Sequence, residues 1–479
     1  MGLKKTALPS RAFVQIIPVF AILLLASCGG DKPGNSEGLN EVEETRTAAN
    51  PLLKLLQAEQ TGVDFQNIIL ESDEDNFTTN VNKYNGGGLA VGDFNNDGVQ
   101  DIYFVCTNGK NKLYINQGGL KFKDVTDATG AASDEGGFET TATLVDINAD
   151  GWLDIYICRA GVVGDSTRRN KLYVNNGIGS AGVLTFSEKA AEYGLDDISA
   201  STGANFFDFD NDGDLDLYLL NHPSEVDCSN KFETVIGPDG KTPMAVLTPR
   251  YDTDSDRLYR NDGGKFTDIS KASGIWNLGY GLSVAVSDFN RDGWLDVYAG
   301  NDFIHPDFYY ENNKNGTFTE RLKESFRHTT RHTMGTDLTD FDNDGLVDLF
   351  AVDMLPMNNY RLKTTKVTMP QSLYTTSVQN GYYEPVARNI LQRNNGNGTF
   401  SDIGCMAGVF ATEWSWSGLL FDMDNDGLRD IHVTNGYRRN VNDNDFFEFQ
   451  YPDIQKASGN NLKSYFKTIQ GVGVIKFGF

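Results

Sequence analysis

The chain has 479 residues, of which 66 are acidic and 41 are Lys or Arg, so its formal net charge is -25. This length allows several domains, but the acidic balance leaves no basic footprint for a nucleic-acid partner, and none is expected. The five cysteines show no CxxC or Cys/His metal spacing. We therefore predict neither a zinc site nor a disulfide framework, and expect Cys106 and Cys158 to be buried in strands.

The first residues have the features of an export signal. Basic residues precede an apolar stretch at 12–26, which is short for a membrane span of ~20 residues and contains Gln15 and Pro18. Residues 25–28, Leu-Ala-Ser-Cys, resemble the bacterial lipobox, in which the cysteine is lipidated. We expect a lipoprotein signal peptide at 1–27, lipidation at Cys28 and a flexible tether at 28–50. An ordinary signal peptide with an incidental cysteine is the alternative.

A helical pattern at 51–60 and a strand pattern at 61–70 precede six copies of an acidic motif, D-x-[DN]-x-D-G-x-x-D. Oxygen side chains at positions 1, 3, 5 and 9, a carbonyl at position 7 and a glycine for the turn at position 6 suit a hard cation with about 6 to 8 oxygen ligands. An EF-hand would need flanking helices and a Glu at position 12, which no copy has. For any single copy, a metal-free Asp/Asn/Gly turn is the alternative.

The predicted metal ligands share these five motif positions in every copy. They are Asp93, Asn95, Asp97, Val99 and Asp101; Asp146, Asn148, Asp150, Trp152 and Asp154; Asp208, Asp210, Asp212, Asp214 and Asp216; Asp288, Asn290, Asp292, Trp294 and Asp296; Asp340, Asp342, Asp344, Leu346 and Asp348; and Asp422, Asp424, Asp426, Leu428 and Asp430.

Strand patterns surround each acidic loop. A strand of small and apolar residues precedes it, a β-branched and aromatic strand follows it, and a third strand such as NKLYIN leads through an Asn/Gly turn into a fourth such as KFKDVT. The varying spacing of the loops places two insertions, His222–Ser255 and Asp353–Arg388, between second and third strands. The chain is therefore predicted to be all-β, a β-propeller of four-stranded antiparallel blades at 51–440. A β-sandwich is the alternative.

The loop and the Phe-containing fourth strand resemble the FG-GAP and VCBS repeats of the integrin α-subunit propeller, and YNGGGLAVGDFNNDGVQDIYF is similar to the cartilage-acidic-protein-like family. This resemblance covers about 60–440. It implies Ca²⁺ in up to six loops and favours the outer surface of a Gram-negative envelope.

Propellers of this family usually have seven blades, whereas the sixth repeat here lacks its third and fourth strands and the tail at 441–479 matches no repeat. The resemblance therefore implies a chain that is cut short. The alternative is that residues 61–70 supply an outer strand that closes the ring.

In a blade of four meandering strands, the acidic loops lie on one face, and the insertions and interblade loops lie on the other. The interblade loops hold Phe138, His328, His332 and a candidate ligand face of Trp276, Tyr280, Trp414 and Trp416. Integrin propellers bind ligand on that face, so a calcium-stabilised binding or adhesion module for an extracellular glycan or partner protein is predicted by analogy. The bland alternative is that these aromatics pack between blades.

The chain shows no G-x-S-x-G, P-loop or H-E-x-x-H motif, and we predict that it is not an enzyme. Two other functions stay open. One is a structural surface protein without a specific ligand, and the other is a propeller-type polysaccharide lyase that uses a basic residue such as Arg327 or Arg331.

Overall fold

The computed structural model describes residues 52–72, 81–133, 137–161, 166–223, 231–365, 369–437, 443–445 and 448. The predicted signal peptide, Cys28, the tether and most of the tail lie outside these residues. Leu55–Phe479 forms one compact unit, which holds every helix and strand. Within the described ranges, no helix is both long and apolar enough to cross a membrane.

Six antiparallel sheets repeat along the chain, five with four strands and the sixth with two described strands. Their strands are β1 (Leu89–Gly92), β2 (Asp101–Phe104), β3 (Lys112–Asn116) and β4 (Phe122–Asp124); β5 (Glu139–Val145), β6 (Asp154–Arg159), β7 (Lys171–Ile178) and β8 (Leu184–Glu188); β9 (Ala200–Phe207), β10 (Asp216–His222), β13 (Arg257–Asn261) and β14 (Phe266–Asp268); β15 (Tyr280–Ser287), β16 (Asp296–Asp302), β17 (Phe308–Asn312) and β18 (Phe318–Glu320); β20 (Gly335–Thr339), β21 (Asp348–Val352), β23 (Ile390–Asn394) and β24 (Phe400–Asp402); and β25 (Ser415–Phe421) and β26 (Asp430–Asn435).

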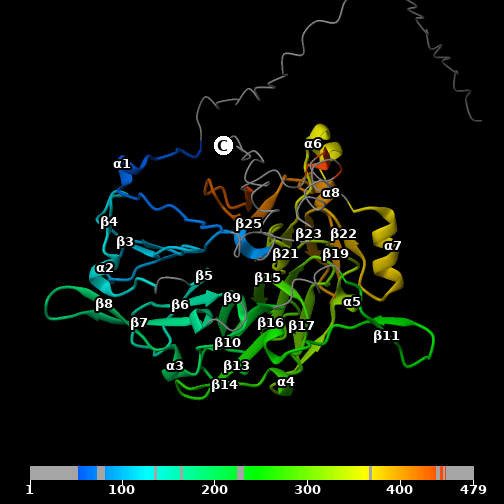
Figure 1. The fold of residues 1–479 in the computed structure, drawn as a ribbon, viewed down its shortest axis with the longest axis horizontal. Coiled ribbons are helices and arrows are strands. Elements are labelled where there is room, and N and C mark those ends of the chain that lie inside the picture. Colours follow the sequence, from blue (N-terminus) through cyan, green and yellow to red (C-terminus); the bar gives the residue numbers. More distant parts are fainter. Residues whose placement is uncertain are drawn as a thin grey trace, which may run out of the picture. The chain divides into compact units, whose positions relative to one another are not determined.

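These sheets are the blades of a β-propeller, as predicted. Consecutive inner strands contact one another in the order β1, β5, β9, β15, β20 and β25. In Figure 1 inner strands such as β5, β9 and β15 lie toward the middle and outer strands such as β8 and β14 lie at the rim. The hydrophobic clusters lie between neighbouring blades; one of them packs Phe94 and Tyr103 of blade 1 against Ile155 and Phe186 of blade 2. The buried core is thus divided among the blade interfaces.

Short helices that the sequence did not predict connect the blades. Each is a single turn after a fourth strand: α2 (Thr126–Thr129), α3 (Ala190–Tyr193), α4 (Ser270–Ser273), α5 (Leu322–Ser325) and α8 (Gly404–Ala407). Four of them end at a glycine in the left-handed region, for example Gly274 at φ 88°, where a side chain would also meet the Phe318 carbonyl. This glycine therefore both ends the helix and permits close approach of the next blade.

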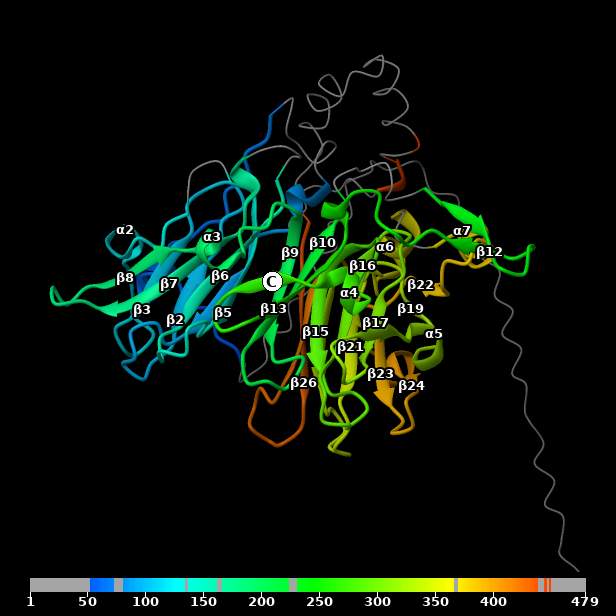
Figure 2. The same ribbon diagram turned by 90° about the horizontal axis from the view of Figure 1, so that it is seen from below.

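The two insertions lie between second and third strands, as predicted, and contain the hairpin β11 (Thr234–Ile236) with β12 (Pro243–Ala245), the helices α6 (Asn359–Thr364) and α7 (Gln371–Gln379), and β22 (Pro385–Val386). Strand β22 pairs in parallel with β19 (Thr329–Thr330) of an interblade loop. Figure 2 shows β12, α6 and α7 gathered at one end of the blades. The remaining short elements are α1 (Ala58–Thr61), η1 (Val81–Tyr84), η2 (Ser166–Arg168) and η4 (Asp252–Asp254).

Among the described residues, no sheet lies between blades 6 and 1. Apolar side chains of the two facing inner strands are 41% to 59% exposed, because no described sheet covers Leu89, Val91, Leu419 and Phe421. The two ends of the ring meet through an aromatic contact, in which the Tyr84 ring lies 5.3 Å from the Tyr437 ring.

The strand predicted at 61–70 is wrong, and this segment does not close the ring. Thr61 ends α1, and residues 62–70 belong to no sheet. They lie against blade 1 instead, where Phe65 stacks on Phe104 at 4.7 Å and the Asn67 side chain exchanges hydrogen bonds with Thr107. Such side-chain contacts and one backbone hydrogen bond, from the Asn108 N–H to the Ile68 carbonyl at 3.3 Å, hold the segment without a strand ladder.

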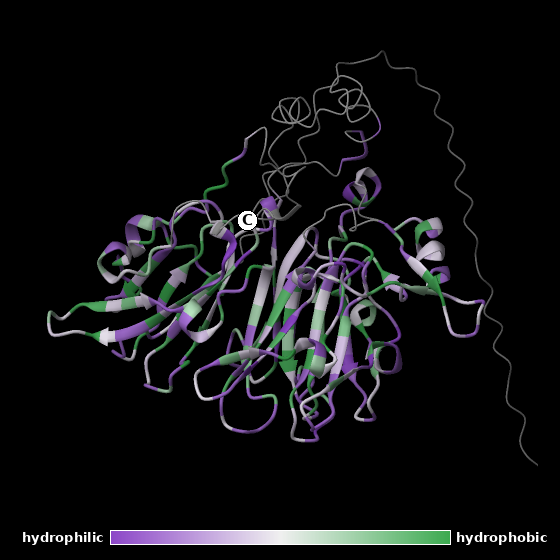
Figure 3. Cartoon of the chain, turned by 60° about the horizontal axis from the view of Figure 1, so that its bottom comes forward, coloured by the Kyte–Doolittle hydropathy of each residue, from purple (hydrophilic) through white to green (hydrophobic). Residues whose placement is uncertain are grey.

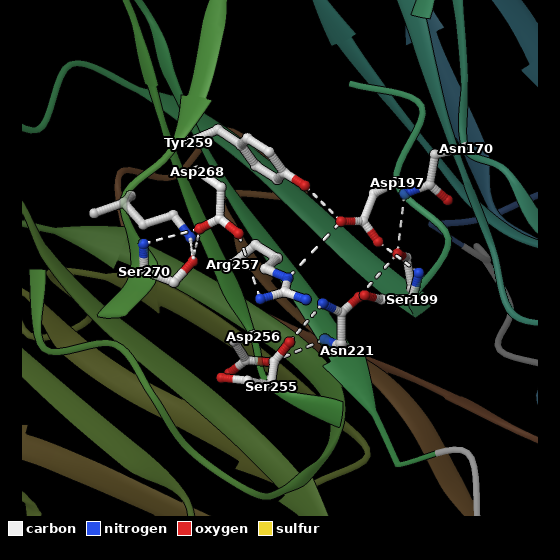
Figure 4. A network of polar contacts seen from close by, with 12 residues as sticks. Asn170, Asp197, Ser199, Asn221, Ser255, Asp256, Arg257, Tyr259, Asp268 and Ser270 are labelled. Carbon is white, nitrogen blue, oxygen red and sulfur yellow. Dashed lines mark hydrogen bonds and ion pairs between the residues drawn. The ribbon is translucent and has the colours of Figure 1, made fainter. Parts of the chain in front are cut away.

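Polar side chains join neighbouring blades where the apolar core ends. Figure 4 shows Asp197, in the connection from blade 2, between Tyr259 and Arg257 of blade 3. Arg257 also lies 3.4 Å from the Asp268 carboxylate. A buried carboxylate is stable only when such partners compensate its charge.

An asparagine at the end of the third strand links three of the blades to the blade before. The Asn312 side-chain NH₂ donates to the Leu295 carbonyl of its own blade at 3.2 Å and to the Phe209 carbonyl of blade 3 at 2.8 Å. Asn175 and Asn394 repeat this pattern. Within the described part of the chain, the Asn261 side-chain NH₂ donates only to its own blade, at the Leu215 carbonyl, 3.1 Å away.

We therefore expect Asn312→Ala to lower the free energy of unfolding by about 1 to 2 kcal/mol more than Asn261→Ala, because it also leaves the buried Phe209 carbonyl without its donor. Urea denaturation of both variants at one calcium concentration measures the difference. Equal losses would show that the interblade bond adds nothing to stability.

Candidate metal centres and insertion face

The six acidic loops are first connections of their blades, and they lie at the opposite end of the blades from the insertions. The loops at the lower ends of the strands in Figure 3 are coloured as hydrophilic. Each loop has a left-handed glycine at position 6, with φ between 83° and 96°. This backbone conformation explains the invariant glycine of the six copies.

The position 1 aspartate folds each loop around its carboxylate. In loop 3, the Asp208 carboxylate accepts hydrogen bonds from the backbone N–H of Asp212 at 3.2 Å and of Gly213 at 3.0 Å. The Asp212 carboxylate in turn accepts from the N–H of Asp214 at position 7. The same backbone contacts recur in the other loops, so every copy folds its chain around the carboxylate of position 1 in the same way.

The position 9 aspartate has a second, structural role that the sequence did not reveal. In blade 4 the Asp296 carboxylate accepts from the N–H of Phe289 at 3.3 Å and from the N–H of Asn312, on the third strand, at 2.8 Å. It therefore joins the loop to two strands. Blades 1, 2, 3 and 5 have the same pair of bonds through Asp101, Asp154, Asp216 and Asp348.

Burial makes the charged form of these aspartates costly. Desolvation raises the pKa of Asp154 and Asp348 to about 6 and the pKa of Asp216 and Asp296 to about 7, and the backbone hydrogen bonds offset only part of this effect. A nearby cation favours the ionised carboxylate. A divalent ion in these loops would therefore stabilise the ionised form of the carboxylates.

Three of the loops bring acidic oxygens together. Carboxylate oxygens lie within 4.8 Å of one another in each of the sets Asp208, Asp210 and Asp216; Asp340, Asp342 and Asp344; and Asp422, Asp424 and Asp430. All three loops have Asp at position 3.

The residues of loop 3 fit a metal ion on a further observation. One carboxylate oxygen of Asp210, Oδ1, is buried without a hydrogen-bond partner in the described structure. Burial and the neighbouring Asp212 and Asp208 raise the pKa of this group. A buried carboxylate oxygen needs a hydrogen bond or a cation, and an oxygen-binding ion would satisfy it.

In loop 5, an arginine side chain lies beside the acidic residues. Arg393, on the third strand of blade 5, lies 2.6 Å from the Asp342 carboxylate and 3.0 Å from the Asp344 carboxylate. This arginine compensates two predicted ligands and would compete with a metal ion in that loop.

Neighbouring loops are linked through position 4, a residue that the sequence analysis left without a role. Position 4 is left-handed in all six loops, with φ between 55° and 61°. Its side chain donates to the carbonyl of the position 6 glycine in the next loop, from Asn96 to Gly151 at 3.0 Å, from Asn211 to Gly293 at 3.3 Å, from Asn343 to Gly427 at 3.3 Å and from Arg291 to Gly345. Ala149 has no donor, so the link from loop 2 to loop 3 is missing.

The insertions and interblade loops meet on the opposite face, the insertion face, as predicted. The Tyr382 hydroxyl of the second insertion donates to the Glu233 carbonyl of the first at 3.1 Å and accepts from its N–H at 3.0 Å. The Tyr382 ring also lies 5.1 Å from the Phe232 ring. The two insertions therefore form one continuous structure.

The four predicted ligand-face aromatics differ in their exposure. Tyr280 and Trp414 are buried, at 2% and 8% exposed, so a surface role for these two residues is wrong. Tyr280 packs against Phe303 at 5.0 Å, and Trp414 stacks on Tyr437 at 4.2 Å. Each ring also packs against the preceding blade: Tyr280 stacks on His222 at 5.9 Å, and Trp414 belongs to a cluster with Phe350 and Val352. Trp276 and Trp416 are half-buried and keep part of their surface in solvent.

Polar side chains of the insertion face include an acid–histidine pair between blades 4 and 5. His332 Nδ1 lies 2.5 Å from Asp302 Oδ1, and Asp353 accepts from the backbone N–H groups of Arg331 and His332 at 3.1 Å each. No described residue bonds to the Arg331 guanidinium group. His328, the other predicted histidine, contacts Asp402 at 2.9 Å.

A central cavity of about 700 Å³ connects the six inner strands. Its walls carry the hydroxyl groups of Thr141, Thr202, Ser283, Thr336 and Ser417, and Trp416 forms part of the same wall. Sequence analysis did not predict this cavity, because its lining combines residues from all six repeats.

Comparison with known proteins agrees with this geometry. A family model described as FG-GAP-like repeat matches residues 93–157, 239–299 and 288–351. The chain carries FG-GAP-like repeats. It is 24% identical to cartilage acidic protein 1 of Mus musculus over 369 residues, which is 74% of this chain and 48% of that protein. It is 26% identical to the Xenopus tropicalis protein over 290 residues, 56% of this chain and 39% of that protein. The chain thus spans less than half the length of these curated relatives.

Solved structures show more distant similarity to these repeats. A lectin of Agrocybe aegerita that recognises non-reducing terminal N-acetylglucosamine matches with a TM-score of 0.38 and 16% identity, over 73% of this chain and 75% of the lectin. The GH43_1 enzyme of Xanthomonas citri complexed with xylose matches with a TM-score of 0.28 and 12% identity, over 66% of this chain and 90% of that enzyme. These values are too low to assign a ligand or an activity.

The missing link between loops 2 and 3 generates a prediction. Ala149→Asn introduces a donor that can reach the Gly213 carbonyl, and Asn tolerates a left-handed backbone better than Ala does. We expect the free energy of unfolding to rise by about 1 kcal/mol. Asn96→Ala, which removes an existing link, should lower it by a similar amount. Urea denaturation at fixed calcium measures both changes, and a 149 variant no more stable than wild type contradicts the role of these links.

Proposed function

We propose that this protein is a calcium-stabilised binding module that holds an extracellular glycan or partner protein on its insertion face without chemically converting it. The observation that carries the proposal is the contact between the two insertions through Tyr382 and Glu233. This contact forms one surface at the end of the blades away from the acidic loops. Binding residues often lie on loops that a rigid scaffold positions.

Exposed apolar side chains on this surface support a binding role. In the hairpin of the first insertion, Val235, Ile236 and Met244 are 55%, 63% and 47% exposed. In the second insertion, Met357 and Tyr360 are 65% and 71% exposed. Apolar groups gathered at the end of a fold are typical of surfaces that meet a partner.

Calcium would be held by the oxygen atoms of motif positions 1, 3, 5, 7 and 9. The ion would supply positive charge to carboxylates that otherwise repel one another and resist ionisation. The buried Asp210 oxygen and the three carboxylate clusters support this assignment. The position 9 aspartates would then stay ionised while joining the loop to two strands.

Membrane attachment forms a second part of the proposal and rests on the sequence alone. Lipidation of Cys28 would tether the propeller to the cell envelope, where the outer surface of a Gram-negative bacterium gives access to extracellular polymers. Catalysis is not part of the proposal. Arg331, His332 and Asp302 are the residues on which a lyase reaction would depend, so an assay for unsaturated products belongs to the same experiment.

The test is a glycan and protein binding screen on the full chain, with about 1 mM calcium and with EDTA. Ile236→Lys changes an exposed apolar residue of the insertion face. The control Leu120→Lys changes an apolar residue that is 55% exposed, in the turn between β3 and β4 at the loop end of the blades and outside the acidic motif. We expect calcium-dependent binding that the first substitution weakens about tenfold or more and the second leaves unchanged.

The reverse order of effects would place binding on the loop face and contradict the proposal. A shortened or unsaturated polysaccharide product would show that the protein is a lyase. No binding to any polymer or protein in the screen would favour a purely structural role.

A further inference from the structure

The central cavity has a definite place relative to the insertion face. Its lining includes residues in the first half of inner strands, such as Leu282 and Ser283 in β15, Gly335 and Thr336 in β20, and Trp416 in β25. Inner strands begin where the interblade loops enter, which is the insertion face. The cavity therefore lies at the insertion-face end of the channel between the blades.

The chemistry of the cavity wall combines hydroxyl groups with one aromatic ring. The Thr336 hydroxyl donates to Ser283 at 3.2 Å, and the Thr202 hydroxyl donates to the Gly281 carbonyl at 2.6 Å. A hydroxyl that donates one hydrogen bond can still accept others. The Thr141 hydroxyl has no hydrogen-bond partner among the described residues. The wall therefore offers acceptors and donors of the kind that a polyol needs.

Trp416 is held in a fixed orientation. Its indole N–H donates to the Gly436 carbonyl, and its ring is parallel to the Tyr437 ring within 8°, with 6.5 Å between centroids. Because the side chain is half-buried and lines the cavity, part of its surface faces the open space. A fixed, partly exposed aromatic ring loses little entropy when a flat apolar face packs on it.

Charged groups beside the cavity compensate one another. Arg331 and His332 lead directly into Met334 and Gly335 of the wall, and His332 pairs with Asp302. The Asp353 carboxylate accepts hydrogen bonds from the backbone N–H groups of Arg331 and His332. The single arginine, Arg331, is outnumbered by the carboxylates of Asp302 and Asp353, so no excess positive charge is left for an anionic ligand. The formal net charge of the whole chain is also negative, at -25. A neutral ligand fits this balance better than a uronic acid or a sulfated sugar.

We propose that the insertion-face end of the channel binds the neutral terminal sugar of a glycan, with Trp416 as the stacking surface and the threonine and serine hydroxyls as hydrogen-bond partners. This inference rests on the proposed function and names the ligand class and the subsite. A volume of about 700 Å³ lies within the range of ligand pockets, roughly 300 to 1,000 Å³. A chain end enters such a cavity, whereas the middle of a polymer would stay outside.

The experiment measures binding of a panel of methyl glycosides, neutral hexoses and N-acetylhexosamines beside one uronic acid, to the full chain by calorimetry in calcium. Trp416→Ala removes the stacking surface, and Thr141→Val removes one hydroxyl without changing its shape. Phe410→Ala is the control, because this aromatic residue of the connection from blade 5 to blade 6 is 36% exposed and does not line the cavity.

We expect wild type to bind at least one neutral glycoside and not the uronic acid. Trp416→Ala should weaken this binding by about tenfold or more, Thr141→Val by about two- to fivefold, and Phe410→Ala should leave it unchanged. Thermal unfolding of each variant shows whether it is folded, and Thr141→Val keeps the test valid if Trp416→Ala is unstable.

Two results separate this inference from the proposed function. In the first, polymers bind and Ile236→Lys weakens their binding, but either no glycoside binds or all three variants bind glycosides as wild type does. The proposed channel subsite would then be wrong, while the proposed binding role of the insertion face would still hold. If the uronic acid binds better than every neutral glycoside, the ligand class is wrong. If neither polymers nor glycosides bind to wild type, both proposals fail.

Discussion

A buried aspartate at the end of the acidic loop, present in five of the six described blades, is the constraint on which the propeller depends. In blade 4, Asp296 accepts hydrogen bonds from the loop at Phe289 and from the third strand at Asn312. One carboxylate thus fixes the hairpin and its neighbouring strand. The same burial raises its pKa to about 7, so at neutral pH the anion is only marginally stable without a compensating charge. Under the proposed function, calcium in the acidic loops would supply that compensating charge.

The loops also determine how blades meet. Asn312 adds a bond to the preceding blade, and position 4 residues such as Asn96 and Asn211 add bonds between neighbouring loops. These contacts occupy the loop face. The insertion face is free to vary, which explains why the two long insertions, the aromatic contacts of Tyr382 and the open end of the channel are all found there. Rigidity at one end of the blades and variation at the other are consistent with a binding module.

The sequence predicted those features that repeat locally. The six loops, the four strands and the positions of both insertions follow from a motif and from strand periodicity. The third-strand asparagine was visible as a repeated residue, yet it was interpreted as part of a turn, because its bond to another blade depends on the ring. The role of position 4 could not be predicted from the sequence either. The residues at this position, Asn, Ala and Arg, have no side-chain chemistry in common, although all of them adopt a left-handed backbone.

Predictions that depended on tertiary contacts were less accurate. Residues 61–70 have strand-like composition, but side-chain contacts such as Phe65 with Phe104 hold them outside any sheet. Tyr280 and Trp414 were expected on a surface because they lie in loops, and packing between blades buries both. No local pattern distinguishes an aromatic residue that binds a ligand from one that fills an interface. Trp416, in the same short segment as Trp414, remains at the cavity wall.

Thermal unfolding of the full chain in about 1 mM calcium and in EDTA, at equal ionic strength, tests the central claim most directly. At this concentration each extracellular-type site would add about 0.4 to 1.4 kcal/mol by mass action, and six sites would add several kcal/mol. The account predicts that EDTA lowers the melting temperature by about 5 to 15 °C and that added calcium restores it. An identical melting curve in calcium and in EDTA would show that the buried carboxylates are stable without metal and would contradict the account.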